Sequence, residues 1–154
     1  PCGYYNHPEK DCVCAPGVVQ KYLNKISGPL LDRIDLHVEV TPVKLEELSS
    51  ERKAEKSDAI RERVILARMK QQERFKEGAV HSNAMMNTQK TREVCKLKPE
   101  GHSLLNKAME RLGLSARAYE RILRVARTIA DLEKSDIIQT SHILEALSYR
   151  KKEE

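Results

Sequence analysis

The chain of 154 residues is long enough for about one to one and a half domains. Charged residues make up 33% of it and no apolar run reaches 18 residues, which excludes a membrane-spanning helix. Because tryptophan is absent and phenylalanine occurs once, any core must be built mainly from aliphatic side chains. No secretory signal follows Pro1, so we expect a soluble, cytoplasmic protein.

The formal net charge of +5 is concentrated in the middle of the chain. Residues 1–50 carry 5 basic and 7 acidic side chains, residues 51–100 carry 13 and 8, and residues 101–154 carry 10 and 8. The balances are therefore −2, +5 and +2. A basic middle segment permits contact with nucleic acid or nucleotide phosphate, but a solvated helix with alternating charges accounts for it equally well.

The first 17 residues form a loop rich in turn residues and cysteine. Cys2, Cys12 and Cys14 lie close together in sequence, which in a chain without an export signal favours metal ligation over disulfides. Structural zinc takes four ligands, and His7 lies between these cysteines as a possible fourth. The spacing is not that of a standard zinc finger, so free thiols in a loop remain the alternative.

The loop is followed by a short helix and then by a strand. Apolar positions predict the helix over residues 17–26, and Ser27-Gly28-Pro29 ends it. Apolar and polar residues alternate over 36–40, which predicts a strand that Pro42 terminates. A single strand is not stable without neighbours, so this strand should belong to a sheet whose other strands lie outside the sequence.

Everything after about residue 44 is predicted to be helical, which makes the fold class mainly α. We expect helices over 57–76 and 88–96, from Pro99 to a C-terminal cap at Gly113, from an N-cap at Ser115 to about Leu132, and from Thr140 or Ser141 onward. A polar linker joins the first two of these helices. Cys95 occupies a helical position typical of a small buried hydrophobe.

The helix that begins after Ser115 has one apolar face and one basic arc. The apolar face consists of Ala118, Ile122, Val125, Ala126 and Ile129. For Arg121, Arg124 and Arg127 we favour a structural role, as long basic side chains along the edge of a packed helix. Arg117 differs because it lies in the first turn, where the helix dipole and unpaired N–H groups already favour a phosphate.

Several catalytic motifs are absent from the sequence. It contains no Gly-Lys dipeptide and hence no phosphate-binding loop, no apolar strand ending in Asp-Glu, and no zinc-protease or serine-hydrolase motif. The five histidines are scattered along the chain. We therefore expect that this chain is not a complete enzyme.

Three stretches, at residues 26–40, 113–132 and 142–150, resemble the magnesium-chelatase-like AAA+ ATPases of bacteria, in particular the competence-protein ComM group. The resemblance covers nearly the whole chain and corresponds to the C-terminal portion of such proteins. It implies a first region, 1–43, that ends the AAA+ core with one remaining strand. It further implies a helical insert or linker at 44–98, a helical lid at 99–150 and a tail at 151–154.

The resemblance also implies roles for two arginines. Arg33, in Leu-Leu-Asp-Arg, would be an arginine finger that reaches the ATP site of a neighbouring subunit. The alternative is a surface arginine paired with Asp32 or Asp35. Arg117, in Leu-Ser-Ala-Arg, would be the sensor 2 residue that contacts the nucleotide phosphates as the lid moves.

The remaining implications concern the whole protein. The resemblance implies ATP and Mg²⁺ as cofactors, a homo-hexameric ring, DNA as a partner, and a role in recombination or branch migration during transformation. It implies a further cysteine before Cys2, which would complete a four-cysteine set for structural zinc. Two alternatives stay open: a free-standing helical nucleic-acid-binding module, and a structural domain that only makes subunit contacts.

Overall fold

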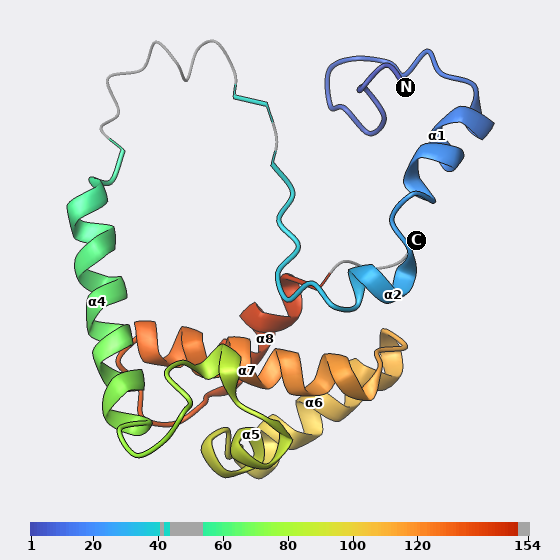
Figure 1. Ribbon diagram of the computed structural model, residues 1–154. Helices are drawn as coiled ribbons and strands as arrows, with labels where there is room; N and C mark the ends of the chain where they lie inside the picture. Colours follow the sequence, from blue (N-terminus) through green and yellow to red (C-terminus); the bar gives the residue numbers. More distant parts are fainter. Residues whose placement is uncertain (41, 44–53, 151–154) are drawn as a thin grey trace. The chain divides into compact units, whose positions relative to one another are not determined.

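The computed structural model describes residues 1–40, 42, 43 and 54–150 (Figure 1). The first part of the predicted insert, 44–53, and the predicted tail, 151–154, lie outside these residues. The chain divides into two compact units. The first consists of Pro1–Ile34 and Val38–Glu51, and the second of Asp35–His37 and Arg52–Glu154.

The first unit contains a cysteine-bearing loop and two short helices, α1 (Pro16–Leu23) and α2 (Gly28–Leu31). Helix α1 confirms the helix predicted over 17–26. Helix α1 ends at Leu23, before the Ser-Gly-Pro sequence that was predicted to end it. That sequence instead starts α2, because proline in the first helical turn lacks only an N–H that would be unpaired there. Val19 is the one buried residue among those described in this unit.

The predicted strand over 36–40 is not formed. These residues are extended, but within the described part of the chain they have no ladder partner, and the one β-bridge there joins Leu97 to Ile138. A strand requires a neighbour that accepts and donates its backbone hydrogen bonds. The side chains of Val38 and Val40 are correspondingly 69% and 86% exposed.

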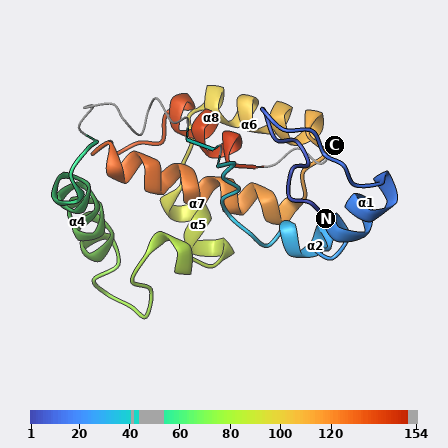
Figure 2. The same cartoon turned by 90° about the horizontal axis from the view of Figure 1, so that it is seen from above.

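The second unit is a helical bundle, and it confirms the mainly α fold class (Figures 1 and 2). Its elements are α4 (Ser57–Arg74), the 3₁₀ turn η1 (Asn83–Met85), α5 (Thr88–Val94), α6 (Pro99–Arg111), α7 (Ala116–Leu132) and α8 (Thr140–Ser148). All five predicted helices of this region are present, with ends that differ by one or two residues. Helix α7 contacts α4, η1, α5 and α8, while α6 packs on α8.

The junction between α6 and α7 follows from its sequence. Gly113 has φ +59°, a left-handed conformation that glycine adopts without a side-chain clash. The N–H of Leu114 bonds the carbonyl of Met109 at 3.0 Å and that of Gly113 bonds Glu110 at 3.4 Å, which is a Schellman motif. Ser115 Oγ then accepts the N–H of Ala118 at 3.1 Å and caps α7.

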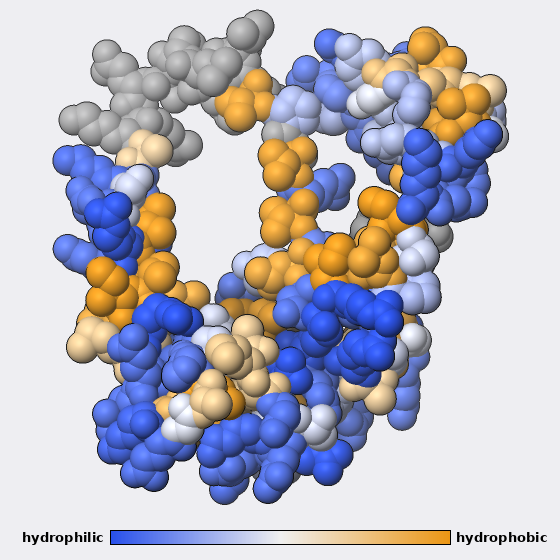
Figure 3. Space-filling model, viewed as in Figure 1, coloured by the Kyte–Doolittle hydropathy of each residue, from blue (hydrophilic) through white to orange (hydrophobic). Residues whose placement is uncertain are grey.

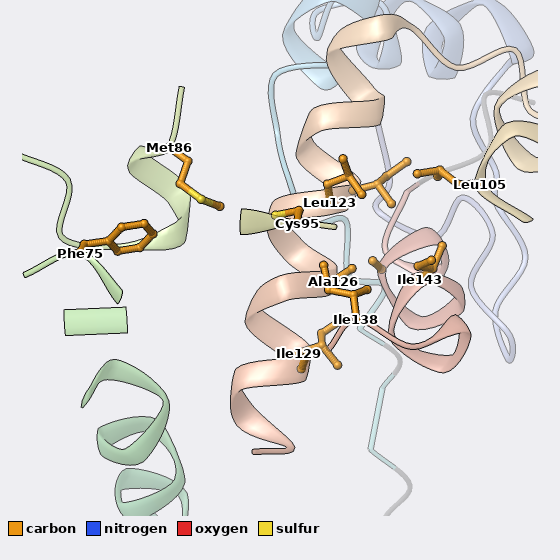
Figure 4. Close-up of a cluster of buried hydrophobic side chains, with 12 residues drawn as sticks. Phe75, Met86, Cys95, Leu105, Leu123, Ala126, Ile129, Ile138 and Ile143 are labelled. Atoms are coloured by element: carbon orange, nitrogen blue, oxygen red, sulfur yellow. The ribbon is translucent and has the colours of Figure 1, made fainter. Parts of the chain in front are cut away.

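The core of the bundle is built around α7 (Figure 4). Phe75 and Met86 lie on one side of this helix, and Leu105 and Ile143 lie on the other. The buried residues of α7 in the core cluster are Ile122, Leu123, Ala126, Ile129 and Ala130. This set is wider than the predicted face because α7 is covered from two sides. Cys95 is buried in the same cluster, as predicted.

Helix α4 is less well covered than the sequence pattern suggests. Ala67 is buried against the bundle, but Ile60 and Val64 are 43% and 46% exposed. Apolar and hydrophilic side chains therefore lie side by side on the surface of α4 (Figure 3).

Candidate functional site

The predicted finger residue follows directly after α2. Asp32 is the C-cap of this helix, and the next residue, Arg33, is exposed. Its Nη1 donates to the carbonyl oxygen of Pro29 at 2.8 Å, which directs the side chain along the short helix. An exposed guanidinium at a helix end is geometrically accessible to a second molecule.

Arg117, the predicted sensor residue, lies in the first turn of α7, immediately after the Ser115 cap and Ala116. Its side chain is exposed. The N-terminus of a 17-residue helix carries unpaired N–H groups and a partial positive charge, so a guanidinium added there increases the attraction for an anion.

Residues 35–37 belong to the helical bundle. An ion pair joins Arg121 Nη1 to Asp35 Oδ1, with the two side chains 22% and 45% exposed. The N–H of His37 donates to the carbonyl oxygen of Tyr149 at 2.8 Å, directly after α8. Because Asp35 lies two residues after Arg33, the segment that follows the predicted finger is attached to the helix that carries Arg117. No pattern in the sequence indicates this attachment, since 86 residues separate the ion-paired side chains.

The other arginines of α7 have structural partners, in agreement with our interpretation of the basic arc. Arg124 bonds Glu120 at 3.4 Å and the hydroxyl of Thr91 at 3.3 Å. Arg127 is buried and donates to the carbonyl oxygens of Ser135 and Asp136 at 2.5 and 2.9 Å.

A buried carboxylate, Asp131, links α4, η1 and α7. Arg74 donates to its two oxygens at 2.7 and 2.5 Å, and Asn83 Nδ2 donates at 2.8 Å. Arg127 Nε adds a fourth bond at 3.2 Å. Burial raises the pKa of Asp131, but the hydrogen bonds from Arg74 and Asn83 and the charge of Arg127 outweigh it, so the pKa lies below its ordinary value. In the sequence, only the i,i+4 spacing of Arg127 and Asp131 indicates this network, and it does so weakly.

In the first unit, the structure brings together the three cysteines that the sequence singled out. The sulfur atoms of Cys2, Cys12 and Cys14 all lie within 4.8 Å of one another. Cys2 Sγ is 3.6 Å from Cys12 Sγ. The N–H of Cys2 donates to Cys14 Sγ at 3.0 Å, and the N–H of Tyr4 donates to Cys2 Sγ at 3.4 Å.

These contacts change the acidity of the thiols. The hydrogen bond from the Tyr4 N–H favours the thiolate and lowers the pKa of Cys2 to about 6. At Cys12 a bond from the Cys14 N–H lowers the pKa, but the bond to Cys2, burial and the neighbouring sulfurs outweigh it, and the pKa is raised. By contrast, burial raises the pKa of Cys95 to about 11, as for a structural thiol.

His7 is not part of the sulfur cluster that the described residues form. Its Nδ1 accepts the N–H of Glu9 at 3.1 Å, and its ring meets the edge of Tyr4 with the centroids 5.6 Å apart. The structure therefore assembles three of the four ligands that the sequence suggested.

Two family models cover most of the chain. The C-terminal domain of magnesium chelatase, subunit ChlI, matches residues 54–150, and magnesium chelatase, subunit ChlI, matches residues 1–48. The chain belongs to the magnesium chelatase ChlI family. The boundary between the two matches falls between the two short helices and the helical bundle, so Arg33 and Arg117 lie in different family domains.

Curated relatives agree with this assignment. The chain is 40% identical over 154 residues to the protein YifB of Escherichia coli, and 40% identical over 151 residues to the competence protein ComM of Haemophilus influenzae. It is 34% identical over 152 residues to the protein Rv2897c of Mycobacterium tuberculosis. Each alignment covers 97% of this chain but only 28–30% of the relative, so the chain spans less than a third of their length.

None of the described helices is both long enough and apolar enough to cross a membrane.

Proposed function

We propose that this chain is the C-terminal part of an AAA+ ATPase, and that it supplies two arginines to nucleotide sites without binding ATP alone. Arg33 acts in trans as the arginine finger of a neighbouring subunit, and Arg117 acts as sensor 2. The observation that carries the proposal is the position of Arg117, exposed in the first turn of α7, in a domain of the ChlI family.

The role of Arg33 rests on charge. During hydrolysis, negative charge shifts on the γ-phosphate, and a guanidinium held next to it stabilises the transition state. Arginine fingers of this kind contribute roughly 10³–10⁵-fold in rate. Arg33 is exposed, which supports a residue that another subunit can contact.

The role of Arg117 rests on the helix terminus. In the bundle, α7 is held at its C-terminal end by Asp131 and along its length by the core, so we expect its N-terminal turn to move together with the bundle. A sensor at this position would report the presence of the γ-phosphate as a displacement of the whole bundle. The Asp35–Arg121 ion pair would pass this displacement to the segment that follows Arg33.

The whole protein would bind ATP and Mg²⁺ through residues that this chain does not contain, and would assemble as a homo-hexameric ring in the cytoplasm. One relative is named a competence protein, which supports DNA as the partner and recombination or branch migration during transformation as the process. The regions 1–43, 44–98 and 99–150 would then be the end of the AAA+ core, an insert or linker, and the lid.

The replacement Arg33→Ala in the full-length protein tests the finger. We expect the ATPase rate of the assembled ring to fall by roughly 10³-fold or more, because the transition-state charge loses its partner. Arg61→Ala is the matched control, since Arg61 is an exposed arginine of α4 in a surface pair with Asp58, and it should leave the rate unchanged. An Arg33→Ala ring that forms normally and retains full ATPase activity would contradict the assignment.

A further inference from the structure

The sulfur cluster of the first unit has the dimensions of a metal site. Zinc lies about 2.3 Å from a thiolate sulfur, and two sulfurs at tetrahedral angles around it are therefore about 3.8 Å apart. Cys2 and Cys12 are 3.6 Å apart at Sγ, and Cys14 lies within 4.8 Å of both. All three cysteines are free thiols, half-buried in the loop.

The backbone around the cluster is arranged to support thiolates. The N–H groups of Tyr4 and Cys2 point at the sulfurs of Cys2 and Cys14, respectively. Gly3, between them, has φ +86°, a conformation that lets the chain turn back over the sulfur of Cys2. Such outer-shell donors orient metal ligands and offset their negative charge.

The first unit has little else to hold it together. Among its described residues Val19 alone is buried, whereas the side chains of Val13, Val18 and Tyr22 are 85%, 48% and 53% exposed. A unit of this size with so small a core is usually stabilised by a disulfide or a metal. A metal that joins both ends of residues 2–14 would therefore add stability that the apolar contacts of the described residues in this unit do not supply.

We propose that Cys2, Cys12 and Cys14 bind one zinc ion as three thiolates, and that this ion determines the fold of residues 2–14. Three soft thiolates select zinc over hard cations such as Mg²⁺ and Ca²⁺. His7 is not the fourth ligand. The fourth position is taken by a group other than the described His, Cys, Asp and Glu side chains, either a solvent molecule or a residue from elsewhere in the protein. This proposal does not depend on the ATPase assignment.

Zinc content of the purified 154-residue chain, measured by elemental analysis after gel filtration under reducing conditions, tests the site. We expect about one zinc per chain, and loss of that zinc in each of the variants Cys2→Ser, Cys12→Ser and Cys14→Ser. Cys95→Ala is the matched control, because Cys95 is buried in the helical bundle, and it should keep the metal. His7→Ala should also keep it.

A second measurement distinguishes loss of the zinc site from unfolding of the whole chain. Because the cysteines lie outside the helical bundle, the helical circular dichroism of the Cys12→Ser variant should remain close to that of the parent chain. Cobalt substituted for zinc should give the sulfur-to-metal charge-transfer absorption of thiolate ligation, weakened in the same three variants. A chain that binds no zinc, zinc that survives Cys12→Ser, or a Cys2–Cys12 disulfide that forms in place of the site would overturn the proposal. Loss of zinc in His7→Ala would overturn the ligand set.

Discussion

Asp131 is enclosed by donors from α4, η1 and α7, and its side chain has no exposed surface. Arg127 is also buried, with 4% of its side chain exposed, while Arg74 reaches the surface at 21%. The desolvation cost of the carboxylate is offset by four hydrogen bonds from charged or amide donors. We expect such a network to fix the position of α4 on α7 more specifically than apolar contacts would.

The replacement Asp131→Ala should destabilise the bundle by about 3–5 kcal/mol, because it leaves Arg127 buried without a counter-charge. Urea denaturation followed by circular dichroism measures this change. Asp136→Ala is the matched control: its carboxylate pairs with Lys70 but is 95% exposed, and its loss should cost less than about 1 kcal/mol. Equal effects of the two replacements would contradict the buried network.

The same carboxylate predicts a pH dependence. Its pKa is lower in the folded chain than in the unfolded chain, so its contribution to stability is complete above its ordinary pKa of about 4. The contribution disappears as the pH falls below that value. The free energies of unfolding of the parent chain and Asp131→Ala should therefore converge in acid, and a constant difference down to the lowest pH would contradict the account.

At the scale of the elements, α7 organises both the bundle and the proposed site. Its N-terminal turn presents Arg117, its middle packs in the core, and Arg121 holds Asp35. The ion pair is partly exposed, and pairs of this kind contribute about 0–1 kcal/mol to stability. We therefore expect the Asp35–Arg121 ion pair to matter mainly because it holds the segment that follows Arg33, the proposed finger. Its contribution to the stability of the fold should be small.

Asp35→Asn in the full-length protein separates these two contributions. Stability should change by less than about 1 kcal/mol, whereas the ATPase rate of the ring should fall, because the segment after Arg33 is no longer held by the charge of Arg121. Thermal unfolding and steady-state ATPase assays measure the two quantities. The Asp58→Asn variant, which removes a more exposed surface pair with Arg61, should affect neither. An unchanged ATPase rate in Asp35→Asn would show that the Asp35–Arg121 ion pair has no role in ATP hydrolysis.

The helices could be predicted because their signals are local. Ser115, Gly113 and Pro99 mark helix ends by their own chemistry, and the apolar spacing of α7 identifies its buried side. The strand predicted over 36–40 is not formed within the described residues, because the neighbouring strands that it requires were expected outside this sequence. The Arg74–Asp131 and Asp35–Arg121 pairs were not predicted. The paired residues are 57 and 86 positions apart in the sequence, and no periodic pattern indicates contacts at such separations.

Only part of the candidate site could be predicted, because only local features can be recognised in the sequence. Cysteine spacing indicated the sulfur cluster, since residues 2–14 form one local loop. His7 is close in sequence but does not belong to the cluster that the described residues form, and its Nδ1 accepts the backbone N–H of Glu9. The roles of Arg33 and Arg117 stay predictions, as they depend on nucleotide sites outside this chain.

At the scale of the whole molecule, part of the positive charge of the middle segment is paired with carboxylates. On α4 and beside it, basic side chains pair with nearby carboxylates: Arg61 with Asp58, Arg63 with Glu55, Lys70 with Asp136 and Lys76 with Glu73. A nucleic-acid-binding module would instead present a continuous basic surface to phosphates. The pairing favours a solvated helix for the basic middle segment.

The isolated chain should accordingly bind DNA weakly. Fluorescence anisotropy with a labelled duplex at 50 and 200 mM salt is the measurement, and we expect little binding at the higher concentration. A protein that neutralises 6–10 phosphates would lose roughly 10³–10⁵-fold in affinity over this range. Tight binding with such a salt slope would favour the free-standing module over a motor part.

Mixed rings test whether Arg33 acts on a nucleotide held by another subunit. Arg33→Ala subunits are combined with subunits that cannot bind ATP but retain Arg33, and the ATPase rate is measured across mixing ratios. Neither variant should be active alone. Mixed rings should recover activity, since an Arg33→Ala subunit can bind ATP while its neighbour supplies the guanidinium. If every mixture stays as inactive as the pure variants while rings assemble normally, Arg33 does not act in trans.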